Sequence, residues 1–331
     1  GVVANTGLAL CKFNKKVFLN GLVGDDFIGK TIMDWFEKNG VVEGIKVVNN
    51  ETTGLSIVIA PAGVDRIFLE SAGCNKIFDI TFINYSAIAK SRLFHFGYPP
   101  LLPRFYYQDG VQLYTMFSKI NEMGVVTSLD FSLPDRSSES GKINWLRILK
   151  KVFSVVDIFI PSLEEALFIM LPSEYENIML STKNGQIIDN ISIDKIRLIG
   201  QRIIDSGVKI VLLKMAHRGV YLKTGDITSV AKKINSDLSV EEWNYRELWI
   251  NGYNVEDLKL KNATGSGDTA VAGFLSSVLD GEGPEYSIKF AAIAGRNNLY
   301  CNNLFYELHD LSETTRQLLH EPNDIVDFKS L

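Results

Sequence analysis

Cysteine and histidine are scarce in this chain of 331 residues, and their spacing suits neither disulfide nor zinc chemistry. The three cysteines, Cys11, Cys74 and Cys301, are an odd number at unrelated spacings. The four histidines are scattered, and none lies near a cysteine at the short spacing of a zinc site. We therefore expect neither a disulfide framework nor a transition-metal site, and such a chain suits a reducing cytoplasm.

Long apolar runs and a surplus of basic residues are also missing. The longest apolar runs, such as 57–61 and 208–213, are far shorter than the roughly 20 residues that span a bilayer. Lysine and arginine total 34 against 39 acidic residues, a formal charge of −5, so nothing favours nucleic-acid binding. With 46% hydrophobic and 22% charged residues, the composition predicts a globular protein without membrane or nucleic-acid partners.

Short apolar runs alternate with stretches of helical periodicity. We expect strands at residues 17–23, 53–60, 66–70, 93–97, 125–131, 157–160, 210–214 and 220–223. We expect helices at residues 4–13, 28–39, 110–123, 143–153, 163–171, 193–206, 269–279, 284–299 and 311–319. This alternation predicts a doubly wound α/β fold, in which helices flank a mainly parallel sheet.

Other segments depart from the alternation. Residues 51–68 read as two alternating strands around Pro61-Ala-Gly63, which predicts an antiparallel hairpin outside the main sheet. The polar stretches 172–190 and 225–244 predict surface excursions, and no strand is expected after Ala263.

The segment with the clearest chemical content is Asn262-Ala-Thr-Gly-Ser-Gly-Asp268. Gly265 and Gly267 flank Ser266, and Asp268 follows where an apolar helix begins. Small residues let backbone N–H groups converge on an anion, and a helix N-terminus adds partial positive charge. Phosphoryl transfer needs such donors and a base for the attacking hydroxyl, so the loop predicts a phosphate site beside Asp268.

Two other interpretations of this loop are open. In a plain helix start, Ser266 is the N-cap and Asp268 a first-turn acid. The order Gly265-x-Gly267-x-x-Ala270 also matches the dinucleotide-binding fingerprint, which needs a buried strand before it and another strand after the helix. Residues 255–261 are alternating and polar, and a second helix follows, so the context argues against dinucleotide binding.

The loop resembles the C-terminal signature of the PfkB (ribokinase-like) carbohydrate kinase family, D-T-x-G-A-G-D before a helix. Further segments resemble motifs of that family in the same order: Ala4-Asn5-Thr6-Gly7, Gly21 to Gly29, Thr53-Gly54, Gly73-Cys-Asn75, Pro161 to Ala166 and Lys214 to Gly219. The resemblance spans nearly the whole chain. It implies a single ribokinase-like domain over residues 1–331 with a small β-lid at about residues 51–75.

The resemblance also implies an ATP-dependent kinase that phosphorylates a hydroxyl of a small sugar or related polyol, and it implies roles for particular residues. Asp268 is the expected general base, and the expected anion hole for the γ-phosphate is formed by Gly265, Ser266 and Gly267. Glu165 is expected to hold Mg²⁺ through water. The ATP site is expected to include Lys214, Gly219, Ala292 and Gly295. The sugar is expected to meet Asn5 and Asn75, and lids of this kind often pair two subunits into a homodimer.

Tyr98 joins the expected sugar site for a different reason, because it follows a strand at the edge where open α/β sheets bind ligands. Several of these residues also have structural interpretations. Asn75 tolerates a turn, Glu165 suits the first turn of a helix, and His95 ends an apolar strand as core residues do.

Replacements within the motifs leave other functions open. Asn262 and Ala263 stand where the family has Asp-Thr, which makes a monovalent-cation site doubtful. Ser162 replaces the Asn of P-N-x-x-E, and Lys214 replaces a Thr, although a lysine can still meet phosphate as a point charge. The alternatives are a catalytically inactive sugar- or nucleotide-binding relative and a nucleoside kinase of the same superfamily.

The family also has a central first strand, part of the lid and a substrate-binding Asp before the position of Ala4. A sheet without that strand would leave buried backbone groups unpaired. We therefore expect either that the sequence lacks its native N-terminus or that another segment fills the gap.

Overall fold

A seven-stranded sheet forms the centre of the molecule in the computed structural model, which describes residues 1–41, 43–59, 67–182, 187–234 and 237–329. Its order is β11-β10-β9-β8-β7-β6-β5. Four strands run parallel: β5 (Leu93–Phe96), β6 (Val126–Leu129), β7 (Ile158–Phe159) and β8 (Ile210–Lys214). The sheet continues antiparallel through β9 (Val220–Thr224), β10 (Glu247–Ile250) and β11 (Ile325–Asp327).

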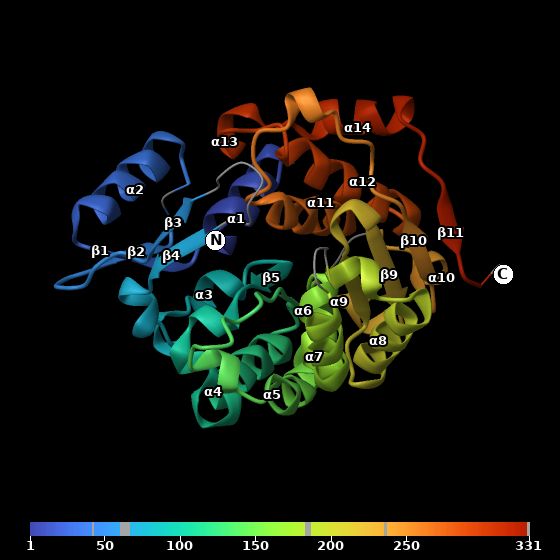
Figure 1. The fold of residues 1–331 in the computed structure, drawn as a ribbon. Coiled ribbons are helices and arrows are strands. Elements are labelled where there is room, and N and C mark those ends of the chain that lie inside the picture. The colour runs from blue at the N-terminus through green and yellow to red at the C-terminus, as the bar shows by residue number, and fades with distance from the viewer. Residues whose placement is uncertain (42, 60–66, 183–186, 235–236, 330–331) are drawn as a thin grey trace.

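Helices cover both faces of this sheet, which confirms the predicted α/β class (Figure 1). One hydrophobic core lies against α4 (Pro103–Glu122), α5 (Trp145–Val152), α6 (Leu163–Met170), α7 (Pro172–Ser181) and α8 (Ile193–Asp205). The second lies against α1 (Val2–Lys12), α9 (Thr228–Ile234), α11 (Ser266–Asp280) and α12 (Pro284–Asn298). Shorter or peripheral helices are α3 (Tyr85–Ile88), α10 (Val240–Trp243), α13 (Leu304–Glu307) and α14 (Leu311–His320). Within the described residues, no helix is both long and apolar enough to cross a membrane.

Two small sheets lie beside the main one, at the blue end of the chain in Figure 1. In the first, β1 (Gly21–Gly24) pairs in parallel with β2 (Ile45–Val48), and α2 (Phe27–Lys38) connects them. In the second, β3 (Leu55–Ile59) and β4 (Ile67–Ser71) form the predicted antiparallel hairpin, while the turn predicted at 61–63 lies outside the described residues. The expectation about the N-terminus stays a prediction.

Asp26 ties α2 to the start of the hairpin. Its Oδ1 accepts a hydrogen bond from Gly29 N at 2.8 Å as the N-cap of α2. The same carboxylate accepts from both the backbone N and the hydroxyl of Thr53.

Several sequence predictions about the periphery were wrong. The stretch 172–190 contains α7, and 225–244 contains α9 and α10, whose Val230 and Trp243 are fully buried. A short helix with one apolar face has a polar average composition, so the composition did not reveal that these segments contribute to the core. Strand β2 and strand β10 were not predicted, and β11 follows Ala263 although no strand was expected there.

A cluster of charges around Glu247 joins α8, β9 and β10. Arg197 donates to Oε1 at 2.7 Å, Tyr221 donates to Oε1 at 2.9 Å, and Lys223 donates to Oε2 at 2.8 Å. Burial opposes ionisation, but these donors outweigh it and lower the pKa of Glu247 to about 2.

We predict that Glu247→Gln destabilises the fold in a pH-dependent way. An acid whose pKa falls on folding stabilises the native state above its unfolded pKa, near 4.5, and loses that contribution as the pH falls to about 2. The variant should lose about 2 kcal/mol of unfolding free energy at pH 7, measured by urea denaturation, and the difference should shrink below pH 4.5. The control is Glu256→Gln, which removes an exposed carboxylate that pairs with Lys259 at the surface. Equal losses in both variants would contradict the prediction.

Candidate active site

The carboxylate of Asp268 is buried among hydrogen-bond donors in the first turn of α11. Asn5 Nδ2 donates to Oδ2 at 2.8 Å, while Thr6 Oγ1 and Tyr98 Oη donate to Oδ1 at 3.2 and 2.8 Å. Asp268 is only 4% exposed, but its surroundings are polar. Three donors therefore replace the water that this buried carboxylate would otherwise bind.

The donors come from two segments that are distant from α11 in sequence. Helix α1, which packs along α11, carries Asn5 and Thr6. Tyr98 follows β5 with a left-handed backbone, φ 63° and ψ 47°, directly before Pro99-Pro100. This conformation is uncommon for a residue with a side chain and is typically retained where function or packing requires it.

The glycine loop forms the N-terminus of α11. Gly265 is the N-cap, with φ +84°, so the interpretation with Ser266 as N-cap was wrong. Ser266 Oγ instead donates to Ala263 O at 2.9 Å, and Thr269 Oγ1 donates to Gly265 O at 2.9 Å. The first N–H groups of a helix, here including Gly267 N, have no intrahelical acceptor and can serve an anion.

Asn298 of α12 holds the glycine loop in place with two hydrogen bonds. Its Oδ1 accepts from Thr269 Oγ1 at 3.0 Å, and its Nδ2 donates to Thr264 O at 2.9 Å. Gly295 allows the close approach of the two helices, because a Cβ at this position would lie 3.2 Å from Ser266 O.

Lys214, at the end of β8, brings a positive charge to the loop. Its Nζ would lie 4.0 Å from a Cβ at Gly267 and donates to Asp130 Oδ1 at 2.7 Å. Burial raises the pKa of Asp130 to about 6 although Lys214 opposes this shift. For Lys214 itself, burial favours the neutral form, but Asp130 and Glu165 together raise its pKa.

Glu165 lies in the first turn of α6 and forms a capping box with Ser162. Ser162 N donates to Glu165 Oε2 at 2.7 Å, and Glu165 N donates to Ser162 Oγ at 3.2 Å. The Ser that replaces the family's Asn therefore has a structural role. Burial, opposed by Lys214, raises the pKa of Glu165 to about 7. Across the described parts of the chain, no cluster of three metal-binding side chains occurs.

The contacts of the remaining predicted residues are structural. Gly219 has φ +83° and ψ −131°, and a Cβ there would lie 2.0 Å from Ile250 O. Asn75 packs against Gly54 at the base of the hairpin, and Ala292 is half-buried on α12. Within the described residues, no hydrogen bond or ion pair joins these three to Asp268, so their ligand roles stay predictions.

Sequence reasoning missed several polar residues of the site. Asp130 directly follows a buried strand, and the carboxyl ends of parallel strands are where ligands bind, so a signal for it existed. Thr6 belongs to the motif Ala4-Asn5-Thr6-Gly7, but only Asn5 of that motif was assigned a role. His95 Nδ1 lies 2.9 Å from Ser128 Oγ, its pKa is lowered to about 3 by burial, and its Nε2 has no partner among the described residues.

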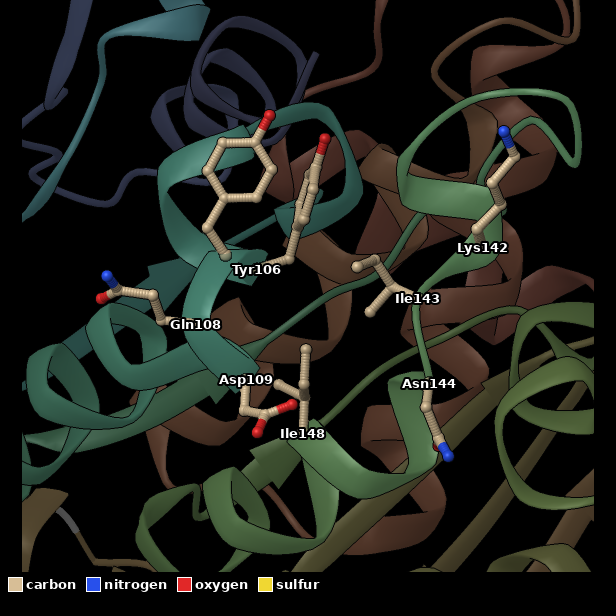
Figure 2. A pocket seen from close by; sticks show the side chains of 8 residues that line it. Tyr106, Gln108, Asp109, Lys142, Ile143, Asn144 and Ile148 are labelled. Carbon is tan, nitrogen blue, oxygen red and sulfur yellow. The ribbon is translucent and has the colours of Figure 1, made fainter.

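A separate hollow of about 430 Å³ lies at the kinked start of α4 (Figure 2). It is lined by residues of α4 and by the segment that enters α5: Tyr106, Tyr107, Gln108, Asp109, Lys142, Ile143, Asn144 and Ile148. None of the predicted site residues lines it.

Comparison with known proteins identifies the class of this α/β protein. Residues 1–240 match the sequence profile described as pfkB family carbohydrate kinase. Because the match covers more than half of the chain, the chain belongs to this family of kinases. The matched range ends before residues 262–268, so membership does not depend on the glycine loop.

Individual relatives and solved structures agree with this assignment. An uncharacterized sugar kinase of Archaeoglobus fulgidus is 22% identical over 262 residues, covering 79% of this chain and 82% of the relative. Ribokinase of Arabidopsis thaliana, solved in complex with ribose and ATP, has a TM-score of 0.71 at 18% identity and covers 96% of this chain and 86% of its own. A putative ribokinase II of E. coli, solved with ATP and Mg²⁺, has a TM-score of 0.71 at 16% identity, with coverage of 97% and 88%. These likenesses confirm the predicted ribokinase-like fold.

We predict that Gly219→Ala strongly destabilises the protein. The backbone of residue 219 is in a region that only glycine adopts easily, and the added methyl group would meet Ile250 O. A loss of about 3 kcal/mol is expected in urea denaturation. The control is Gly124→Ala, where φ is +76° but nothing lies within 4 Å of the new Cβ, and where about 1 kcal/mol is expected. A smaller loss at 219 than at 124 would show that the close contact does not matter.

Proposed function

We propose that this protein transfers the γ-phosphate of ATP to a hydroxyl of a small sugar or related polyol. The observation that carries the proposal is the buried carboxylate of Asp268, held by three donors beside a glycine loop and the Lys214 ammonium. Membership of the pfkB family and the likeness to a ribokinase solved with ribose and ATP support it.

Asp268 would act as the general base, and its hydrogen bonds indicate which oxygen does so. A carboxylate accepts about four hydrogen bonds, two on each oxygen. Thr6 and Tyr98 both donate to Oδ1, whereas Asn5 is the only donor to Oδ2 among the residues that the structure describes. The substrate hydroxyl would therefore donate to Oδ2, and Asn5 would then lie beside the sugar.

The N-terminus of α11 would receive the transferred phosphoryl group. Its first N–H groups, at Gly265, Ser266 and Gly267, point the positive end of the helix at charge on the phosphate, and Lys214 adds a full positive charge. Gly219, Ala292 and Gly295 remain our proposal for the ATP side of the site, and Asn75 and Tyr98 for the sugar side.

Glu165 would hold Mg²⁺, as Mg²⁺ prefers one or two carboxylates together with water and substrate phosphates. The donors present fit this chemistry, because Glu165 supplies a carboxylate oxygen and no larger ligand cluster is needed. When bound, the ion would offset negative charge on the phosphates. The hairpin β3–β4 would act as a lid that excludes water, the competing acceptor of the phosphoryl group.

We predict that Asp268→Asn abolishes most turnover. Losing the general base should lower kcat by about a thousandfold while KM for ATP changes little, measured as ADP formation across a panel of sugars, polyols and nucleosides. The control is Asp280→Asn at the far end of the same helix, where the carboxylate pairs with Lys15 and kcat should not change.

Each outcome of this panel is informative. Equal rates in wild type and Asp268→Asn would remove Asp268 from the mechanism. Turnover of nucleosides alone would replace the sugar with a nucleoside acceptor. No turnover of any acceptor by the wild-type protein would favour a binding protein without catalysis.

We predict a smaller effect for Tyr98→Phe. The variant loses one of the hydrogen bonds to Oδ1 of Asp268, so the carboxylate is held less firmly in the orientation that a general base needs. A kcat reduced about tenfold at neutral pH is expected. Tyr221→Phe is the matched control, since Tyr221 also donates to a buried carboxylate, that of Glu247, outside the site. A kcat equal to that of wild type in Tyr98→Phe would show that Tyr98 does not act through Asp268.

A further inference from the structure

Asp130 is a buried acid whose hydrogen bonds are only half complete. Its side chain is fully buried after β6. Oδ1 accepts from Lys214 Nζ at 2.7 Å and from Phe131 N at 2.8 Å. Oδ2 is buried without a partner among the described residues. An unpaired charged oxygen is costly to bury, so a purely structural role does not account for this residue.

A second buried Asp–Lys pair in the same sheet shows what a structural pair looks like. Asp157 lies just before β7, and both of its oxygens accept from Lys233 Nζ at 2.9 Å. Thr127 N and Thr127 Oγ1 also donate to Oδ2 of Asp157. That carboxylate is fully satisfied, and it lies at the opposite ends of the strands from Asp130 and Lys214.

The pair Asp130–Lys214 lies where the proposed reaction takes place. Strands β6 and β8 run parallel on either side of β7, so Asp130 and Lys214 emerge at the same edge of the sheet. That edge faces the N-terminus of α11, where Lys214 Nζ would lie 4.0 Å from a Cβ at Gly267. A lysine has a long, flexible side chain with several rotatable bonds, and the bond to Asp130 fixes its end.

We propose that Asp130 is a positioning residue, which holds the Lys214 ammonium in place and aimed at the glycine loop so that it meets the transferred phosphoryl group. This inference rests on the proposed function. Asp130 does not touch the reacting atoms and acts only through Lys214.

The charges around Lys214 determine how the proposal can be tested. Three acids interact with Lys214: Asp130 after β6, Glu165 on α6 and Asp268 on α11. His95 on β5 is also close enough that the positive charge of Lys214 helps to lower its pKa. Burial alone would lower the pKa of Lys214, and these acids counteract it. Removing the charge of Asp130 therefore lets Lys214 lose its proton at lower pH, whereas an arginine in its place would stay charged.

The experiment compares kcat and the affinity for AMP-PNP between pH 6 and 10 in wild type, Asp130→Asn and Asp130→Asn/Lys214→Arg. In Asp130→Asn we expect kcat to fall at least tenfold at pH 8. We also expect kcat and AMP-PNP affinity to decline on the alkaline side, with a midpoint at least one pH unit below that of wild type. The double variant Asp130→Asn/Lys214→Arg should show no such alkaline decline, whatever the absolute value of its kcat. Asp157→Asn is the control, and it should lose stability without any change in kcat or in the pH profile.

Two results would overturn the proposal. One is an Asp130→Asn protein that folds and keeps the wild-type alkaline profile in both measurements. The other is an alkaline decline that persists with arginine at position 214, because another group would then be titrating. If Asp130→Asn does not fold, Asp130→Glu is measured instead, which keeps the charge but displaces Lys214; kcat should fall at least tenfold without an alkaline decline, and an unchanged kcat would equally overturn the proposal.

Failure of the proposed function would be recognised separately. If wild type transfers no phosphoryl group, the proposed function fails, while AMP-PNP affinity still reports whether Asp130 keeps Lys214 charged beside bound phosphates. If wild type is active and Asp130→Asn matches the Asp157→Asn control in both measurements, only the inference about Asp130 fails.

Discussion

The burial of one carboxylate at the N-terminus of α11 constrains most of the structure around it. A charge that is 4% exposed is tolerated only when donors replace the water it has lost, and Asp268 receives them from Asn5, Thr6 and Tyr98. Helix α1 must therefore lie along α11, and the chain after β5 must turn sharply enough to direct Tyr98 inward. The left-handed backbone of Tyr98 is part of this arrangement.

The site separates two kinds of charge at the carboxyl edge of the sheet. On one side, the carboxylate of Asp268 accepts hydrogen bonds from the neutral groups of Asn5, Thr6 and Tyr98. On the other, the ammonium of Lys214 is surrounded by carboxylates, which keep it charged despite burial. The glycine loop lies between them, close enough to Lys214 that a larger residue at Gly267 would approach its side chain.

The structure shows what several residues of the family's motifs contact, and some of these contacts stabilise the fold. Gly219 is required because its backbone approaches Ile250 O, and Ser162 with Glu165 forms a capping box that starts α6. A motif residue can thus be indispensable for the fold and also lie beside a ligand. The replacement of Asn by Ser at 162 is compatible with the fold, since both residues cap helices.

The sequence by itself determined the α/β class, the antiparallel pairing of β3 with β4, the helix that starts after Gly265 and the position of Asp268 in its first turn. These features are local, because hydrophobic periodicity, glycine at a helix start and an acid in the first turn leave a signature within a few residues. Only the tertiary structure decided which donors hold Asp268, that Asp130 lies next to Lys214, and that α9 and α10 contribute buried residues to the core. Those outcomes depend on the pairing of strands and helices that are up to about 260 residues apart in sequence, and no local pattern encodes which distant side chain a buried charge will meet.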